Sequence, residues 1–244
     1  MQHCYLYLSQ LQKFIRYFVG RIYKPLLAKY LSSTRTYQYK GVSIIIPPEV
    51  FHPAFFFSTK LLLKYLGNQP LQGKSFLELG AGSGLIAISA AKKGALVTAS
   101  DINPIAVEFL EVNRKRNNDV PMEIILSDLF SDIPVGPFDF IAINPPYFKK
   151  NPASPKDFAW YCGKDGEYFE NLFRSIGPYL HKQSRVLIIL SEVCDLDMVH
   201  RYAEKHGRLL KIVSTHQNIL EKMFLYELAP RQKEFHHTIP HNEE

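Results

Sequence analysis

The feature that most constrains the fold of this chain is an alternation, from residue 37 onward, of short apolar runs with segments of helical spacing. Six runs are mostly apolar, as strands buried on both faces of a sheet require; they are residues 76–79, 96–100, 122–126, 138–143, 186–190 and 209–213. The segments between them carry helix-forming residues; they are residues 85–93, 105–116, 168–180 and 196–205. This alternation predicts an α/β fold with a doubly wound, mostly parallel sheet.

The last apolar run, residues 223–228, follows the preceding run after a short loop. A parallel connection needs a long crossover, usually a helix, and this loop is too short to provide one. We therefore expect an antiparallel C-terminal strand, which completes a seven-stranded sheet.

The size and composition of the chain indicate one main domain. With 244 residues, of which 46% are apolar, the chain can bury a single substantial core. We expect this domain to span residues 41–230, between an arm at residues 1–40 and a tail at residues 231–244. The tail is polar, so we expect it to be disordered and its histidines not to bind a metal ion.

The apolar segments and the cysteines indicate the compartment. No run of eighteen apolar residues is present, so we expect no transmembrane segment, and charges interrupt the N-terminus in a way that fits no signal peptide. The cysteines are odd in number and widely spaced, which disfavours a zinc site and is typical of a cytoplasmic protein; they are Cys4, Cys162 and Cys194.

The basic character of the chain, a net charge of +6, is concentrated in the arm. Residues 1–40 contain no Asp or Glu and these basic residues: Lys13, Arg16, Arg21, Lys24, Lys29, Arg35 and Lys40. An apolar face at helical spacing is formed by Leu8, Leu11, Ile15, Phe18 and Ile22. We expect an amphipathic helix that is interrupted near Pro25. Its apolar face can dock on the main domain, its basic face can bind RNA, or the helix can lie on an anionic membrane surface.

The carboxyl ends of the predicted strands are where an open α/β sheet binds ligands. After the first strand, Glu78 precedes a turn that contains Gly80, Gly82 and Gly84, and such glycines let a ligand approach the backbone closely. The dinucleotide fingerprint needs its third glycine one place later, where this chain has Leu85. The departure disfavours binding of NAD.

Acidic residues end the next two predicted strands. Asp101 ends the second strand, nineteen residues after Gly82, where an acidic side chain can accept hydrogen bonds from ribose hydroxyls. Asp128 follows the third strand, where it can accept from an exocyclic amine such as that of adenine. Either residue alone is equally well explained as a turn or helix cap. Their shared position at consecutive strand ends favours a functional role.

The fourth strand runs into Asn144-Pro145-Pro146-Tyr147. The two prolines remove backbone donors and stiffen the loop, so a ligand meets carbonyl acceptors and the Asn144 side chain. Two such acceptors, the Asn144 side-chain oxygen and the Pro145 carbonyl, can orient a planar NH₂ group and favour its pyramidal form during attack. The Tyr147 ring can offer a face for stacking. Catalysis by such a site consists mostly of positioning and electrostatics, without a strong base.

These stretches together resemble the class I S-adenosylmethionine-dependent methyltransferases that carry an NPPY motif, over about residues 45–228. The cofactor half of that family is similar to LELGAGSGLIAISAAKKGALVTASDINPIAVEFLEVNRKRN, and the HemK-type protein-glutamine methyltransferases are similar to SDLFSDIPVGPFDFIAINPPYF. Two further stretches resemble the HemK type less strongly, CGKDGEYFENLFRSI and ILEKMFLYEL. The second of them resembles the closing hairpin of that type. The resemblance implies a Rossmann-like methyltransferase domain with S-adenosyl-L-methionine as its cofactor.

The resemblance also implies roles for individual residues. Gly80, Gly82 and Gly84 would surround the methionine portion of the cofactor, Asp101 its ribose and Asp128 its adenine. Glu78 would orient the loop or the cofactor amino group, and Thr59, in FFFSTKLLLKYL, would lie near the methionine carboxylate. The residues that would hold the accepting nitrogen are Asn144, Pro145, Pro146 and Tyr147.

Two departures from the HemK type leave the acceptor open. The segment before the domain is about half as long as the helical bundle of the bacterial release-factor methyltransferases, and PPEVFHPAFFFST replaces a PRPETE-like segment. We expect an N-methyltransferase whose acceptor is either a protein glutamine amide or an exocyclic amine of an RNA base, which the basic, aromatic arm favours. The alternatives are a small-molecule methyltransferase and a non-catalytic binding module. The sequence gives no indication of DNA as a partner and none of the oligomeric state.

Overall fold

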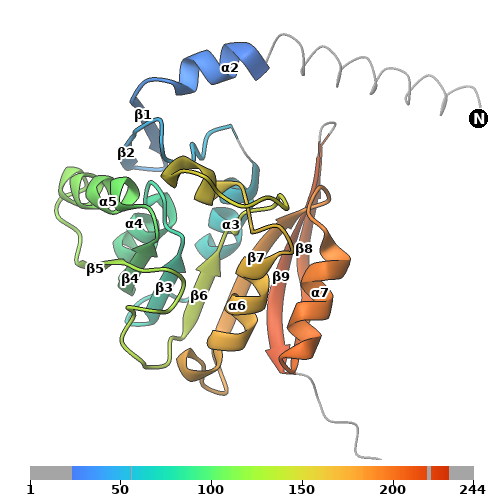
Figure 1. Ribbon diagram of the computed structural model, residues 1–244. Helices are drawn as coiled ribbons and strands as arrows, with labels where there is room; N and C mark the ends of the chain where they lie inside the picture. Colours follow the sequence, from blue (N-terminus) through green and yellow to red (C-terminus); the bar gives the residue numbers. More distant parts are fainter. Residues whose placement is uncertain (1–23, 56, 219–220, 231–244) are drawn as a thin grey trace, which may run out of the picture.

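A seven-stranded sheet forms the centre of the protein, whose computed structural model describes residues 24–55, 57–218 and 221–230 (Figure 1). The strand order is β5-β4-β3-β6-β7-β9-β8. The strands are β3 (Ser75–Leu79), β4 (Leu96–Asp101), β5 (Met122–Leu126), β6 (Phe140–Ile143), β7 (Arg185–Ser191), β8 (Arg208–Gln217) and β9 (Lys222–Pro230). The pairs from β5 to β7 are parallel, and β9 is antiparallel to both β7 and β8. The predicted α/β fold with an antiparallel C-terminal strand is confirmed.

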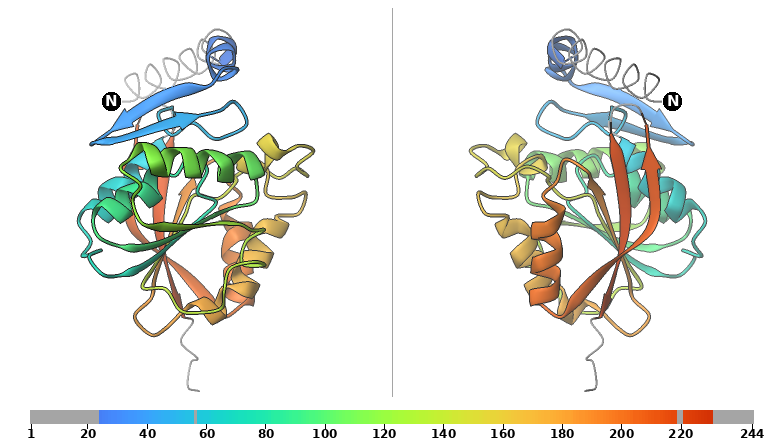
Figure 2. Two further views of the ribbon diagram at one scale, coloured as in Figure 1. Left: turned by 90° about the vertical axis from the view of Figure 1, so that its left-hand side faces the viewer. Right: turned by 90° about the vertical axis from the view of Figure 1, so that its right-hand side faces the viewer.

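Helices cover both faces of this sheet (Figure 2). They are α3 (Phe57–Gly67), α4 (Leu85–Lys92), α5 (Pro104–Arg116), α6 (Glu167–Ser175) and α7 (Leu196–Lys205). Side chains alternate between the faces along each strand. On β3, Phe76 packs in the core under α3, α4 and α5, whereas Leu77 packs in the core under α6 and α7. Strands that are buried on both faces account for the continuous apolar runs in the sequence.

Most predicted elements agree with the structure to within a few residues, and one helix does not. The helix expected at residues 168–180 ends at Ser175 and is followed by the short 3-10 helix η3 (Gly177–Tyr179). Pro178 cannot donate a backbone hydrogen bond, so the α-helix does not continue through it. The 3-10 helix is anchored by the Tyr179 hydroxyl, which donates to the carbonyls of Phe130 and Ile133 at 3.1 Å and 2.9 Å.

The N-terminal part of the described chain differs from the expected helical arm. Helix α2 (Lys24–Leu31) is followed by an antiparallel hairpin of β1 (Arg35–Tyr39) and β2 (Val42–Ile46). The turn between the strands contains Lys40 and Gly41, both with positive φ, which matches the twist of a two-residue hairpin. This hairpin lies across the expected boundary at residue 40. Residues 8–22, where the apolar face was expected, lie outside the described residues.

Two asparagines, Asn113 in α5 and Asn117 directly after this helix, attach β2 to the rest of the domain. The Asn113 side chain accepts from the Ile45 amide at 2.7 Å and donates to the Ile45 and Ser83 carbonyls at 2.9 Å and 3.0 Å. Asn117 exchanges an equivalent pair of hydrogen bonds with Ser43. These side chains satisfy the outer edge of β2 as a neighbouring strand would, and Asn113 joins that edge to the loop after β3. Among the described residues, no helix is long and apolar enough to span a membrane.

Candidate active site

A cavity opens at the carboxyl ends of β3, β4 and β6, where parallel strands bring together loops that are far apart in the sequence. Nine of the predicted site residues line it: Thr59, Glu78, Gly80, Gly82, Asp101, Asn144, Pro145, Pro146 and Tyr147. Asp128 lines an adjoining hollow at the end of β5, and the two hollows share Gly80, Ile102, Pro146, Phe158 and Tyr168. Gly84 lines neither.

The loop after β3, residues 80–84, is called the glycine loop here, and its glycines differ in role. All three have positive φ, between 53° and 79°. A Cβ atom on Gly80 would meet nothing within 4 Å, so this backbone is open to a ligand. A Cβ atom on Gly84 would lie 2.5 Å from the side chain of Leu110. Gly84 therefore allows α5 to pack closely against the glycine loop.

Glu78 is a buried carboxyl group, only 5% exposed, between the glycine loop and α4. Its Oε2 accepts a hydrogen bond of 2.6 Å from the Ala87 amide in the first turn of that helix. Burial raises the pKa of Glu78 well above its ordinary value, against the lowering effect of this hydrogen bond. The Glu78 carboxyl group therefore fixes the start of α4 and also faces the cavity.

Asp101 ties the glycine loop to the end of β4. Its Oδ2 accepts from the Gly82 amide at 2.7 Å, and its Oδ1 accepts from the Asn103 amide at 2.8 Å. Burial raises the pKa of Asp101, although these amides act in the opposite direction. Asn103 rather than Asp101 caps α5, through a hydrogen bond from the Ile105 amide. Each Asp101 oxygen retains acceptor capacity, so the carboxylate can also serve a ligand in the cavity.

Asn144 is oriented by Tyr147, a contact that sequence reasoning did not predict. The Tyr147 hydroxyl donates to Asn144 Oδ1 at 2.9 Å and lies 3.3 Å from the Ile189 carbonyl oxygen. Burial raises the pKa of the Tyr147 phenol, so the hydroxyl stays protonated and remains a donor. One acceptor position on Asn144 Oδ1 is left for a ligand.

The outer wall of the cavity is aromatic and comes from two distant segments that sequence reasoning missed. Phe51 lies before α3, and Trp160 follows the 3-10 helix η2 (Pro155–Ala159). Their ring centroids are 5.5 Å apart. Bridges from Phe148 to Tyr161 and from Lys150 to Gly163 hold the second segment as a compact loop. Nothing in the spacing of these residues indicates that they meet, because the fold brings them together.

Acidic side chains line both the cavity and the adjoining hollow. Carboxyl groups come from Glu49, Glu78, Asp101 and Glu221 in the cavity and from Asp128 and Glu167 in the hollow. Within the described part of the chain, no Lys, Arg or His lines either space. Negative charge in a partly desolvated cleft favours a cationic ligand and disfavours an anionic one.

Comparisons with known proteins agree with this architecture. Residues 42–161 match the family model of the methyltransferase small domain. The chain is 39% identical over 160 residues to a protein of Methanocaldococcus jannaschii whose name provisionally describes it as a protein N5-glutamine methyltransferase. That match covers 63% of this chain and 78% of the relative. The ribosomal protein L11 methyltransferase of Thermus thermophilus is 34% identical over 125 residues, and this chain spans 49% of its length.

Solved structures show the same fold at low sequence identity. The E. cuniculi complex responsible for methylation of the termination factor eRF1 has a TM-score of 0.57 at 20% identity, with 75% of this chain and 99% of that one covered. A T. thermophilus 16S rRNA N2 methyltransferase in complex with AdoMet and guanosine has a TM-score of 0.56 at 17% identity, with 80% and 50% covered. From the family model and the M. jannaschii relative, the chain belongs to the S-adenosylmethionine-dependent methyltransferases.

Proposed function

We propose that the protein is an N-methyltransferase that binds S-adenosyl-L-methionine and methylates the side-chain amide of a glutamine in a protein of the translation apparatus. The observation that carries this proposal is Asn144, whose Oδ1 is held by the Tyr147 hydroxyl beside Pro145, in a cavity that acidic but no basic side chains line within the described residues. Such a site receives N–H groups and disfavours phosphate.

The cavity suits the proposed cofactor, which would supply a methyl group on a positively charged sulfonium. Asp101 would accept hydrogen bonds from the ribose hydroxyls, and Asp128 would accept one from the adenine amine. Glu78 would face the cofactor amino group across Gly80. Thr59 lies in the first turn of α3, whose dipole favours a carboxylate.

The acceptor nitrogen is controlled by residues at the end of β6. An amide nitrogen is a poor nucleophile because its lone pair is delocalised into the carbonyl group. Asn144 Oδ1 and the Pro145 carbonyl would each accept one N–H and hold the nitrogen with its lone pair toward the methyl group. The hydrogen bond from the Tyr147 hydroxyl would keep Asn144 Oδ1 in place during methyl transfer. This arrangement supplies positioning and electrostatic stabilisation and needs no strong base.

A protein acceptor is favoured over RNA by the charge of the cavity and by one relative. The M. jannaschii protein is named for glutamine methylation, and the E. cuniculi complex acts on a termination factor. The RNA alternative is supported by basic residues near the described N-terminus, Lys29, Arg35 and Lys40, and by the fold of the 16S rRNA enzyme. Phosphate groups close to the cavity would meet Glu49 and Glu221.

Labelling with radioactive cofactor tests the proposal. The protein is incubated with methyl-labelled S-adenosylmethionine and, in separate reactions, with a purified termination factor, ribosomal protein and total RNA. We expect label in the protein fractions, with the termination factor as the preferred acceptor, and an initial rate of labelling about 100- to 1000-fold lower with Asn144→Ala. Label in RNA alone, or the same labelling with Asn144→Ala, would contradict the proposal.

A further inference from the structure

Glu221 is an acidic residue that lines the cavity on the β9 side, across β6 from Asp101 and the glycine loop. The strand order places β4 and β3, with Asp101 and the glycine loop, on one side of β6 and places β7 and β9 on the other. Glu221 directly precedes β9 and lines the same cavity as Asn144 and Tyr147. It therefore lies on the acceptor side of the site.

The position of Glu221 is fixed from several directions. Its amide donates to the Asn218 side-chain oxygen at 2.9 Å, and its carbonyl accepts from the Asn218 amide at 3.0 Å. The carboxyl group accepts from the amide of Phe57, the first residue of α3, and the Phe57 ring stacks on His216 with centroids 3.9 Å apart. A side chain held in this way is ordered before any acceptor binds.

The carboxyl group keeps capacity for a ligand beyond its contact with α3. One hydrogen bond from Phe57 uses one of about four acceptor positions on the two oxygens. The group is partly buried, which raises its pKa. Ser58, 2% exposed, also lines the cavity, and its hydroxyl lies close to that of Tyr147 without a partner at full hydrogen-bonding geometry within the described residues. The acceptor side thus presents a carboxylate with unused acceptor positions and a buried hydroxyl group.

We propose that Glu221 binds the acceptor protein by accepting an N–H from the chain that flanks the methylated glutamine, with the Ser58 hydroxyl donating to a neighbouring carbonyl. The inference rests on the proposed function, because a peptide offers N–H and C=O groups side by side. Peptide backbone is rich in donors, whereas the phosphates that flank an RNA base are anionic and would be repelled by Glu221.

A simple cap on α3 is the alternative role of Glu221, and two substitutions separate the roles. Glu221→Gln keeps the shape of the side chain and an oxygen that accepts from Phe57, but it removes the charge. Glu221→Lys removes the acceptor and reverses the charge. Glu192→Gln is the matched control, because Glu192 is an exposed carboxylate near Glu221 that does not line the cavity.

The test measures steady-state methylation of the termination factor, its binding to the protein loaded with S-adenosylhomocysteine, and thermal unfolding. For Glu221→Gln we expect the acceptor KM and the acceptor Kd to rise about tenfold, as loss of one charge-assisted hydrogen bond predicts, with kcat, cofactor Kd and the unfolding midpoint unchanged. Glu221→Lys should lose acceptor binding, and Glu192→Gln should behave as the wild type.

The outcomes distinguish this inference from the proposed function. A wild type that methylates the termination factor, with the same acceptor KM and Kd in Glu221→Gln, overturns the role of Glu221 alone. A lowered unfolding midpoint in Glu221→Gln without a change in KM identifies a cap and also overturns it. A wild type that labels RNA and no protein overturns the proposed function and this inference together.

Discussion

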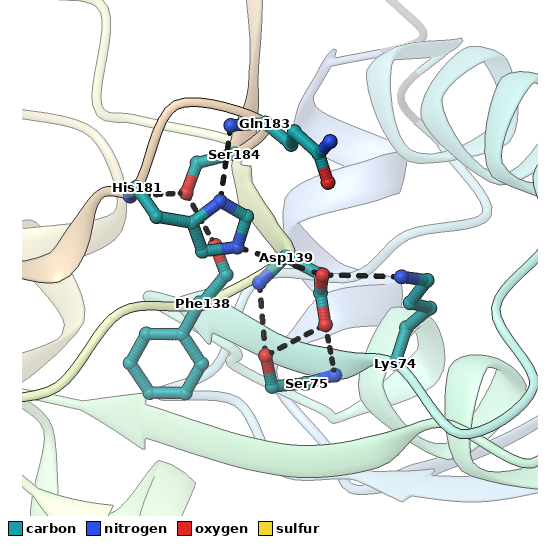
Figure 3. Close-up of polar contacts among 7 residues, drawn as sticks. All are labelled: Lys74, Ser75, Phe138, Asp139, His181, Gln183 and Ser184. Carbon is teal, nitrogen blue, oxygen red and sulfur yellow. Dashed lines mark hydrogen bonds and ion pairs between the residues drawn. The ribbon is translucent and has the colours of Figure 1, made fainter.

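The two ends of the central sheet use carboxyl groups in opposite ways. At the carboxyl end of the parallel strands, burial raises the pKa of Glu78 and Asp101. At the amino end, hydrogen bonds from Ser75, above all from its amide, lower the pKa of Asp139. Figure 3 shows Asp139 among its partners, which include Lys74 at 3.3 Å and His181 at 3.5 Å.

The amino end is a closed network of polar groups. The Ser75 amide and hydroxyl each donate to Asp139 Oδ2 at 3.0 Å, and the Asp139 amide donates back to Ser75 Oγ at 2.9 Å. The Ser184 hydroxyl donates to the Phe138 carbonyl at 2.6 Å. These contacts join the beginnings of β3, β6 and β7. Their charges are matched within the protein, which is typical of a structural role.

At the carboxyl end, the negative charges of the acidic groups are not matched by cationic side chains within the described residues. Its acidic groups accept hydrogen bonds from backbone amides, but no cationic side chain within the described residues lines the cavity that they face. Ionised and partly desolvated carboxylates of this kind are stabilised by a bound cation. The difference indicates that one end of the sheet serves stability, and it agrees with the proposal that the other end binds a ligand. Substitutions at the two ends should therefore affect different measurements.

The largest effect is expected from Asn144→Ala. Loss of the oriented Oδ1 acceptor should lower kcat about 100- to 1000-fold, the range found when one positioned polar group is removed from an active site. Tyr147→Phe should lower kcat by about tenfold, because Asn144 remains but is no longer held by the hydroxyl. Cofactor affinity, measured by calorimetry, should change in neither variant. A rate close to that of the wild type in Asn144→Ala would remove the amide-orienting role.

The next largest effect is expected from Asp101→Ala. Loss of hydrogen bonds to a carboxylate should weaken S-adenosylmethionine binding by about 1 to 3 kcal/mol. Calorimetric titration of the protein measures this directly. Asp139→Asn is the control from the other end of the sheet, and its cofactor affinity should equal that of the wild type. Equal affinity in both variants would contradict the assigned role of Asp101.

Cofactor binding should also depend on pH. The pKa of Glu78 lies well above its ordinary value of 4.5. As the pH falls, Glu78 should therefore be protonated while the pH is still above 4.5, and the site should lose negative charge and affinity for a cation. The stability of the free protein should change with pH in the opposite direction to its cofactor affinity. A raised carboxyl pKa stabilises the fold at low pH, and this contribution is lost as pH rises through the folded-state pKa. Glu78→Gln should flatten the affinity profile, and an unchanged profile would exclude Glu78 as the titrating group.

The smallest effect is expected from Asp139→Asn, on stability alone. Its lowered pKa means that the ionised carboxylate stabilises the fold above its ordinary value of 3.8 and that this contribution is lost as pH falls through the lowered pKa. Chemical denaturation should therefore show a loss of about 1 to 2 kcal/mol at neutral pH that disappears as the pH falls through the lowered pKa. A loss that persists in acid would assign the effect to packing instead.

The sequence predicted the parts of the molecule that local patterns determine. Strand, glycine loop and helix are consecutive in the chain, so the positions of Glu78 and Gly80 followed from a short pattern. Asp101 was placed at its strand end by the same alternation, and its contact with Gly82 agrees with that placement. The antiparallel C-terminal hairpin followed from the short loop between its strands.

The remaining features depend on long-range contacts that spacing does not reveal. Phe51 meets Trp160, and Glu221 meets Phe57, only because the sheet brings their loops together. The β1–β2 hairpin was missed because residues 1–40 were assigned together to a basic helical arm, although the alternating Val42, Ile44 and Ile46 are all buried. Gly84 was assigned to the cofactor from its place in the motif, whereas it lines neither hollow and an added Cβ atom there would collide with Leu110 of α5.

Locating the transferred methyl group on the acceptor tests the proposed mechanism most directly. The termination factor is incubated with the protein and S-adenosylmethionine, digested and examined by tandem mass spectrometry. We expect one methyl group on the side-chain nitrogen of a glutamine. A methyl group on any other residue, or an unmodified factor in a reaction where an RNA base is methylated instead, would contradict it.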